Sequence, residues 1–163
     1  MKKIETKKLV IIALLVALGI VLSRYLSIQT PIVRVGFGFL PNVVIAMLFG
    51  PVYAAFGAAA ADFLGTVLFS GDYFPGFTIT AFLAGLVYGF FIYKHEKDLV
   101  RISIAVIIVA TVLNLGLNTY WLKILLNEGY LALLPTRIVK AFVMVPIEII
   151  CIRAVAGRIG YMK

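Results

Sequence analysis

The chain has 163 residues, of which 63% are hydrophobic and only 13% are charged. Soluble domains carry about 25% charged residues, so the composition excludes an ordinary soluble protein and indicates an integral membrane protein. The net charge of +8 would suit a nucleic-acid partner, but the cations stand at the ends of apolar runs, which is typical of membrane topology instead.

Six apolar runs follow one another along the chain, and a bilayer core needs about 20 apolar residues per crossing helix. We therefore expect an all-α membrane protein with about six transmembrane helices, forming one integral-membrane domain over residues 1–163. The first run resembles a signal peptide, but no small-residue cleavage pattern follows it, so we expect it to stay as a span. The predicted spans cover residues of about 8–28, 37–49, 52–69, 77–93, 102–122 and 131–155.

The connections between these spans carry signals of their own. An extended, proline-containing segment over residues 29–34 joins the first two spans. The second span is short for a full crossing at about 1.5 Å per residue, and it ends at Gly50-Pro51, a pair that stops one helix and starts the next. Pro146 predicts a kink in the last span.

The distribution of Lys and Arg predicts the orientation. With the N-terminus inside, ten of the fifteen Lys and Arg residues fall on the inner side, so both termini are expected in the cytoplasm. Each of the five outer cations either anchors a helix end at the lipid headgroups or attracts an anionic ligand, and both readings stay open. These five residues are Arg24, Arg34, Lys123, Arg137 and Lys140.

The stretch over residues 113–144 holds the most specific group of polar side chains. Asn114, Asn118 and Trp121 are spaced by four and three residues, which places two amides and the only tryptophan on one helix face. Arg137 and Lys140 are three residues apart, so two cations share a face of the next helix. Amides, an indole and paired cations at the mouth of two helices would bind a flat heteroaromatic ligand with acidic groups.

Other reactive side chains point to structure rather than chemistry. Asp62 lies about ten residues into its span, where a carboxylate needs a partner such as Arg24 or a loop amide. We favour a structural role of this kind over proton coupling. We interpret Glu148, in the last span, in the same way. His95 has no second His or Cys nearby, so a metal site is not expected. The single cysteine, Cys151, excludes a disulfide framework.

Motifs for catalysis or energy coupling are absent from the sequence. It contains no P-loop, no HExxH, no GxSxG and no cysteine cluster, so neither an enzyme nor a cofactor site is expected. A membrane protein with a binding mouth and no energy-supplying module either needs an energised partner or acts as a passive facilitator.

Several runs in order resemble the substrate-binding (S) subunits of energy-coupling-factor (ECF) vitamin transporters, over residues of about 9–153. The runs at 34–41, 48–51 and 61–65 resemble the family at large, whereas those at 74–78, 117–122 and 135–140 look like its folate-specific branch. The resemblance implies a six-helix domain in the bacterial cell membrane that captures folate outside. It also implies docking to a transmembrane coupling protein (T component) that carries two ATP-binding-cassette ATPases.

The resemblance also suggests roles for individual residues. The family's AxxxA docking motif on the first helix matches Ala13 and Ala17. Together with the polar side chains described above, it leads us to expect a set of substrate-binding residues: Arg24, Arg34, Phe77, Asn114, Asn118, Trp121, Arg137 and Lys140.

The chemistry of folate suits this set. Aromatic faces stack on a flat pterin, amides pair with its edge, and Arg and Lys bind the carboxylates of the glutamyl tail. Thiamine, a cation, would fit the cationic mouth badly, and neither pantothenate nor biotin has a flat conjugated ring. An S component for another vitamin, such as pantothenate or a pterin-like compound, stays open, as does a membrane scaffold protein without transport activity.

Overall fold

The computed structural model describes residues 5–29, 34–69, 71–95 and 98–160. These residues form six helical segments and one short β-hairpin. The fifth segment is continuous over Leu99–Leu126, although its middle part is a π-helix, η1. The helices are α1 (Thr6–Arg24), α2 (Phe39–Phe49), α3 (Pro51–Phe69), α4 (Pro75–Ile92), α5 (Leu99–Ile108), η1 (Val109–Leu117), α6 (Asn118–Leu126) and α7 (Tyr130–Gly160).

Among the described residues, four helical segments are long and apolar enough to cross a membrane. They are Thr6–Arg24, Pro51–Phe69, Pro75–Ile92 and Leu99–Leu126. The helix α2 has only 11 residues, as its short apolar run predicted, and α7 has 31 residues but carries charged side chains along its length. The fold is therefore helical, with four clear candidate spans and two further helical segments packed among them.

The connection between α1 and α2 contains a small antiparallel sheet, which the expectation of an all-α protein did not include. Strand β1 (Ser27–Gln29) pairs with β2 (Arg34–Gly36), and Ile28 lies opposite Val35. The proline-containing segment at 29–34 was predicted to be extended, and the structure pairs the residues at its two ends. A Cβ on Gly36 would collide with Ser27, so glycine permits this close approach.

The helix boundaries follow the local signals. Gly50 caps α2 with a φ of 98°, which favours glycine, and Pro51 begins α3, so the predicted stop and restart is confirmed. Asn127 ends α6 with a left-handed φ of 53°, a conformation that asparagine tolerates better than most residues.

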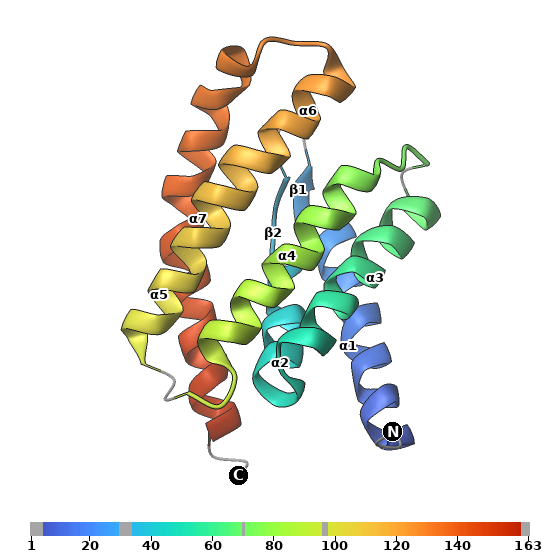
Figure 1. Ribbon diagram of the computed structural model, residues 1–163, viewed down its shortest axis with the longest axis vertical. Coiled ribbons are helices and arrows are strands. Elements are labelled where there is room, and N and C mark those ends of the chain that lie inside the picture. Colours follow the sequence, from blue (N-terminus) through green and yellow to red (C-terminus); the bar gives the residue numbers. More distant parts are fainter. Residues whose placement is uncertain (1–4, 30–33, 70, 96–97, 161–163) are drawn as a thin grey trace.

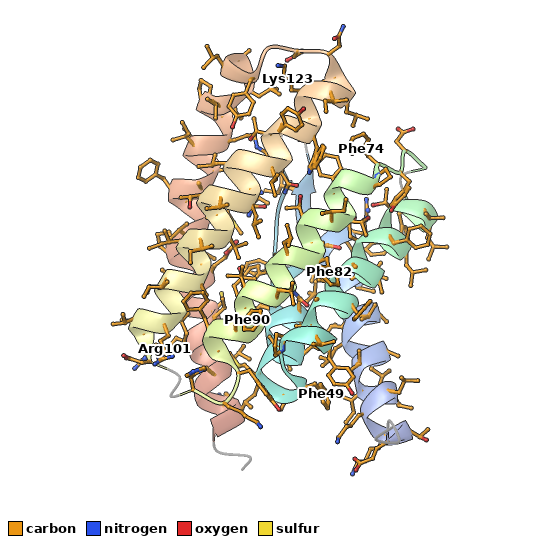
Figure 2. All side chains as sticks on the ribbon, in the orientation of Figure 1. Phe49, Phe74, Phe82, Phe90, Arg101 and Lys123 are labelled. Atoms are coloured by element: carbon orange, nitrogen blue, oxygen red, sulfur yellow. The ribbon has the colours of Figure 1, made fainter. Side chains whose placement is uncertain are left out.

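Figure 1 shows how the segments are arranged. The helix α1 begins and α7 ends at the same end of the molecule, whereas the turns after α3 and α6 lie at the opposite end. Arg101, near the start of α5, and Lys123, near the end of α6, accordingly lie at opposite ends of the molecule (Figure 2).

The apolar core lies between α2, α4, α5 and α7. Its fully buried side chains include Ile45 of α2, Ile102 of α5 and Ile152 of α7, which belong to one hydrophobic cluster. The helix α1 packs against α2 and α3 from one side, and only Gly19 and Ile20 of it are buried. Large apolar side chains such as Phe142, which is 77% exposed, face outward, as expected for a surface in contact with lipid.

Candidate functional site

A central cavity of about 230 Å³ lies between α1, α2, α3, α4, η1 and α7. Its polar lining comes from two sets of helices. Arg24 of α1, Asn42 of α2 and Asp62 of α3 form what we call the N-terminal polar group. A second set, the C-terminal polar group, consists of Tyr88 of α4, Asn114 of η1 and Glu148 of α7.

The N-terminal polar group is held by hydrogen bonds to neighbouring helices. Arg24 Nη2 donates to Thr66 Oγ1 at 3.1 Å, and Thr78 Oγ1 donates to Asp62 Oδ2 at 2.9 Å. Asp62 therefore has a hydrogen-bond partner, and this partner is the Thr78 hydroxyl of α4, which is neither Arg24 nor a loop amide. Asn42 Oδ1 is buried and has no hydrogen-bond partner among the described residues.

The C-terminal polar group lies deep between α4 and α7. Tyr88 is 2% exposed and Glu148 is 8% exposed, and the Tyr88 hydroxyl donates to Glu148 Oε2 at 3.4 Å. A carboxylate at this depth is costly unless it is hydrogen-bonded, and Tyr88 supplies one such donor. Glu148 thus has a structural partner, as expected from the sequence.

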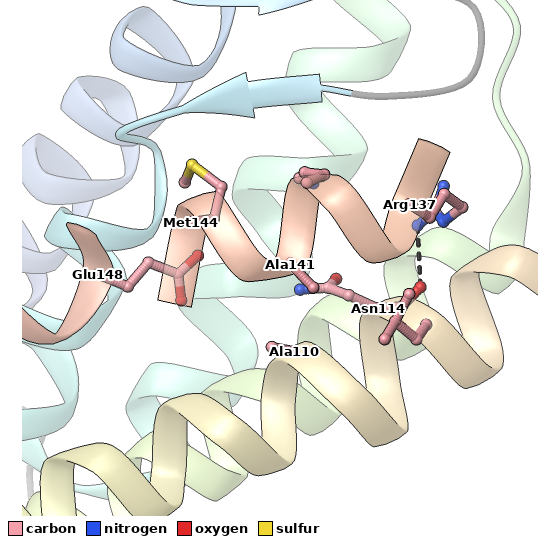
Figure 3. A pocket seen from close by; sticks show the side chains of 8 residues that line it. Ala110, Asn114, Arg137, Ala141, Met144 and Glu148 are labelled. Atoms are coloured by element: carbon pink, nitrogen blue, oxygen red, sulfur yellow. Dashed lines mark hydrogen bonds between the residues drawn. The ribbon is translucent and has the colours of Figure 1, made fainter. Parts of the chain in front are cut away.

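A narrow cleft adjoins the central cavity and shares Asn114 and Glu148 with it. Arg137 and Lys140 of α7 both line the cleft, so the prediction that the two cations share one helix face is confirmed. Figure 3 shows Arg137 beside Asn114: its Nη2 donates to the Asn114 backbone carbonyl at 2.9 Å. Arg137 is 6% exposed, so its charge is largely shielded from solvent.

The π-helix η1 explains how a backbone carbonyl becomes available to Arg137. In an α-helix the amide of Asn118 would donate to the carbonyl of Asn114, four residues earlier. Here it donates to Leu113, five residues earlier, and the Asn114 carbonyl accepts from Arg137 and from Thr119 Oγ1 at 3.4 Å. A regular α-helix was predicted over this segment, because a wider, π-helical turn leaves the pattern of apolar residues in the sequence almost unchanged. Such segments frequently mark functional sites.

Trp121 packs against the start of α4. Trp121 Nε1 donates to Thr80 Oγ1 at 3.2 Å, and its ring centroid lies 5.8 Å from that of Phe74. A Cβ on Gly76 would lie 2.5 Å from Trp121 Cδ2, so the indole packs tightly against the start of α4. Trp121 therefore joins α6 to α4 and lies outside the lining of the central cavity and the cleft.

Asn118 and Phe77 also lie outside these two linings. Asn118 Nδ2 donates to Asn114 Oδ1 at 3.0 Å, which confirms that the two amides share a face. Asn118 Oδ1 is buried and has no hydrogen-bond partner among the described residues. Phe77 packs on Phe74, with ring centroids 5.8 Å apart.

Arg34 and the AxxxA pair are the remaining predicted residues. Arg34 belongs to strand β2, but its side chain lies outside what the structure describes. Ala13 and Ala17 are exposed on α1, whereas Gly19, Ser23 and Arg24 of the same helix line the cavity.

Five polar lining residues were not among the ligand-binding candidates predicted from the sequence: Ser23, Asn42, Asp62, Tyr88 and Glu148. Asn42 is an amide in an otherwise apolar helix, and that was the available signal. Tyr88 offered none, because tyrosine is common in membrane helices and its neighbour Glu148 is 60 residues away in the sequence.

The family of the chain follows from comparison with known proteins. The family model for the substrate-specific component of ECF transporters matches residues 7–156. The chain belongs to the ECF substrate-specific components. These S components are membrane proteins that bind a transported substrate, so the chain is not an enzyme, and the resemblance seen in the sequence is confirmed.

Individual relatives of this S component carry a more specific name. The folate transporter FolT of Clostridium novyi (strain NT) is 43% identical over 153 residues, which cover 93% of this chain and 88% of that protein. FolT of Leuconostoc mesenteroides is 36% identical, with coverage of 90% and 83%. A crystal structure of FolT bound with folic acid superposes with a TM-score of 0.90 at 35% identity and covers 94% of both chains.

Proposed function

We propose that this S component captures folate on the outer face of the cell membrane and delivers it inward as part of an ECF-type, ATP-dependent transporter. The observation that carries the proposal is the polar central cavity that opens beside a cleft lined by two cations. The likeness to FolT bound with folic acid, over 94% of both chains, supports the same ligand.

The size of the cavity suits one ring system of folate rather than the whole molecule. Sites for drug-sized ligands measure about 300–1,000 Å³, and the central cavity has about 230 Å³. We therefore assign the pterin to the central cavity and the glutamyl tail to Arg137 and Lys140 in the adjoining cleft. Arg and Lys bind carboxylates through charge-assisted hydrogen bonds, and the tail carries two carboxylates.

The proposed topology has about six crossings, both termini in the cytoplasm and the turns after α3 and α6 outside. It is supported by the excess of Lys and Arg on the inner segments and by the ends of α1 and α7, which lie together (Figure 1). This orientation places Arg24 and Arg137 in the outer part of their helices, where an external ligand would reach them. The location is the bacterial cell membrane.

Delivery requires partners, because the sequence holds no nucleotide-binding motif. We propose a transmembrane coupling protein with two ATP-binding-cassette ATPases, docked on the α1 face that presents Ala13 and Ala17. Both alanines are exposed, and small residues let a partner helix approach closely. The protein also requires a lipid bilayer, and the large apolar side chains exposed on its surface suit contact with lipid.

Uptake in cells tests the whole proposal. Radiolabelled folate should accumulate in a folate-uptake-deficient bacterium only when this chain, the coupling protein and both ATPases are expressed together. An ATPase variant that binds but cannot hydrolyse ATP should abolish the accumulation. Accumulation of another vitamin, and none of folate, would favour an S component of different specificity. No accumulation of any vitamin would favour a scaffold protein.

A further inference from the structure

We propose that folate binding is coupled to the uptake of a proton by Glu148, which is the counterion of Lys140 until the glutamyl tail takes its place. The inference rests on the proposed function and deepens it, because it gives the tail site a dependence on pH. Glu148 lines both the central cavity and the cleft, and Figure 3 shows it on α7, the helix that also carries Arg137.

The charges that line the cavity and the cleft do not balance a bound dianion. In the part of the chain that the structure describes, these linings hold three cations and two carboxylates: Arg24, Arg137, Lys140, Asp62 and Glu148. Their net charge of +1 becomes −1 when folate adds the two ionised carboxylates of its tail. An excess charge is costly in a site that is shielded from water, so one carboxylate is expected to take up a proton when folate binds.

Glu148 depends on Lys140 for its negative charge. Tyr88 is its one hydrogen-bond partner among the described residues, and the contact is long at 3.4 Å. Lys140 lies about two turns earlier on α7, and its charge acts on the Glu148 carboxylate. Side chains of a helix lean towards its N-terminus, so the carboxylate extends towards Lys140.

Asp62 is less suited to take up this proton. Thr78 Oγ1 donates to it at 2.9 Å, and the Arg24 guanidinium lies about one turn beyond it on α3, where Arg24 Nη2 donates to Thr66. The pterin ring that we assign to the central cavity carries no charge, so folate leaves this cation in place. The shorter hydrogen bond and the retained cation both favour the ionised form of Asp62.

The tail exchanges one counterion for another. A tail carboxylate on Lys140 brings a second negative charge within reach of Glu148, and two neighbouring carboxylates favour protonation of one of them. The proton comes from solvent and converts the Glu148 carboxylate to a neutral carboxyl group, while no other bond changes.

Other groups around Glu148 offer no competing site for this proton. Among the described residues, α5 and α6 contribute nothing to the two linings, and the polar groups there from α2 and η1 are the amides of Asn42 and Asn114. Tyr88 of α4 is a donor to Glu148 and is neutral. Because the bound state holds the additional proton, the affinity for folate should fall as the pH rises.

The test counts protons by calorimetric titration of folic acid into the detergent-purified chain, at about pH 7 in two buffers of different ionisation enthalpy. The unmodified chain should take up about 0.5 to 1 proton per folic acid, and close to none with a pterin that lacks the glutamyl tail. Glu148→Gln, which is neutral and of the same shape, should take up close to none with either ligand. Glu128→Gln, the same change in an exposed turn outside both linings, should keep the full uptake.

The affinity supplies a second readout. From about pH 6 to about pH 7.5, which is above the ordinary range for the carboxyl groups of the tail, the affinity of the unmodified chain should fall by up to about tenfold per pH unit. The affinity of Glu148→Gln should not change with pH over this range.

Each outcome decides the assignment. Folate binding without proton uptake, equal uptake with the tail-less pterin, or undiminished uptake in Glu148→Gln overturns the role of Glu148 but leaves folate binding intact. Absence of folic acid binding to the unmodified chain refutes the proposed function itself. Where Glu148→Gln does not yield folded protein, Tyr88→Phe decides, because it removes a donor to the ionised carboxylate and so lets more of the free protein hold the proton in advance. Reduced uptake in that variant supports the coupling, and unchanged uptake overturns it.

Discussion

Arg137 connects the proposed tail site to the packing of the helices. Its guanidinium donates to the Asn114 carbonyl at 2.9 Å and also lines the cleft beside Lys140. A guanidinium has five N–H donors, so it can hold the backbone and a ligand carboxylate at the same time. Lys140 lines the same cleft, so both cations can reach the carboxylates of a ligand bound there.

We predict that Arg137→Ala and Lys140→Ala each weaken folate binding by about 2–5 kcal/mol, because a buried carboxylate loses its charged partner. A pterin without the glutamyl tail should lose much less affinity. Arg137→Ala should also lower the melting temperature, since it removes the donor to Asn114. Calorimetry with both ligands measures the first effect, and thermal unfolding measures the second.

The matched control is Lys123→Ala, which removes an exposed cation at the end of α6, outside the cleft. It should leave the affinity for both ligands unchanged. Equal losses for folate and the tail-less pterin in the cleft variants would refute the tail assignment.

The fluorescence of Trp121 offers a way to detect folate binding. We predict that folate changes its fluorescence and that Trp121→Ala weakens binding, because α6 is continuous with η1, which lines the cavity. Trp121→Phe keeps an aromatic ring but loses the hydrogen bond to Thr80, so its loss should be smaller. Unchanged emission at saturating folate would limit Trp121 to joining α6 and α4.

At the scale of the helices, the sequence predicted the apolar segments and their punctuation well. Gly50-Pro51 ends α2 and starts α3, and the short apolar run before it becomes a helix of 11 residues. These features depend on local chemistry, which a single sequence displays. The pairing of β1 with β2 was missed, since it depends on register between two segments that are too short to show a pattern.

The candidate site was predicted only in part, because it also depends on how separate segments of the chain pack together. Spacing along one helix correctly placed Arg137 with Lys140 and Asn114 with Asn118. It could not show that Asp62 and Asn42 enter the same cavity as Glu148, because that depends on how three helices pack. Nor could it show that Trp121 faces α4, where glycine at position 76 leaves room for the indole.

Close packing of α3 against α4 gives a prediction at this scale. A Cβ on Gly85 would lie 2.5 Å from the Ala54 carbonyl oxygen, so the two backbones approach within a distance that only glycine permits. Gly85→Ala should destabilise the folded chain by about 1–3 kcal/mol through overpacking. Gly157→Ala in α7, where a Cβ meets nothing within 4 Å, is the control and should not lower stability. Equal melting temperatures for the two variants would contradict the close packing.

At the scale of the whole molecule, the residues proposed for docking are not among those that line the cavity. Ala13 and Ala17 are exposed on α1, about three and about two turns before Arg24, which lines the cavity. We predict that Ala17→Trp abolishes folate uptake and co-purification with the coupling protein, because a bulky side chain holds the two helices apart. Folate should still bind the isolated chain normally.

Ala154→Trp provides the comparison for this variant, since Ala154 is exposed on α7 rather than on α1. It should retain both uptake and the partner. Loss of folate binding in Ala17→Trp, with the coupling protein still bound, would place the docking face on another surface of the chain.

The most direct measurement is equilibrium binding of radiolabelled folate to the detergent-purified chain without its partners, with unlabelled vitamins as competitors. The account predicts saturable binding at one site per chain, displaced by folate and not by thiamine, biotin or pantothenate. The cavity and its cations lie within this chain, so no partner is needed for capture. Absence of saturable folate binding, or displacement by one of the other vitamins at similar concentrations, would contradict it.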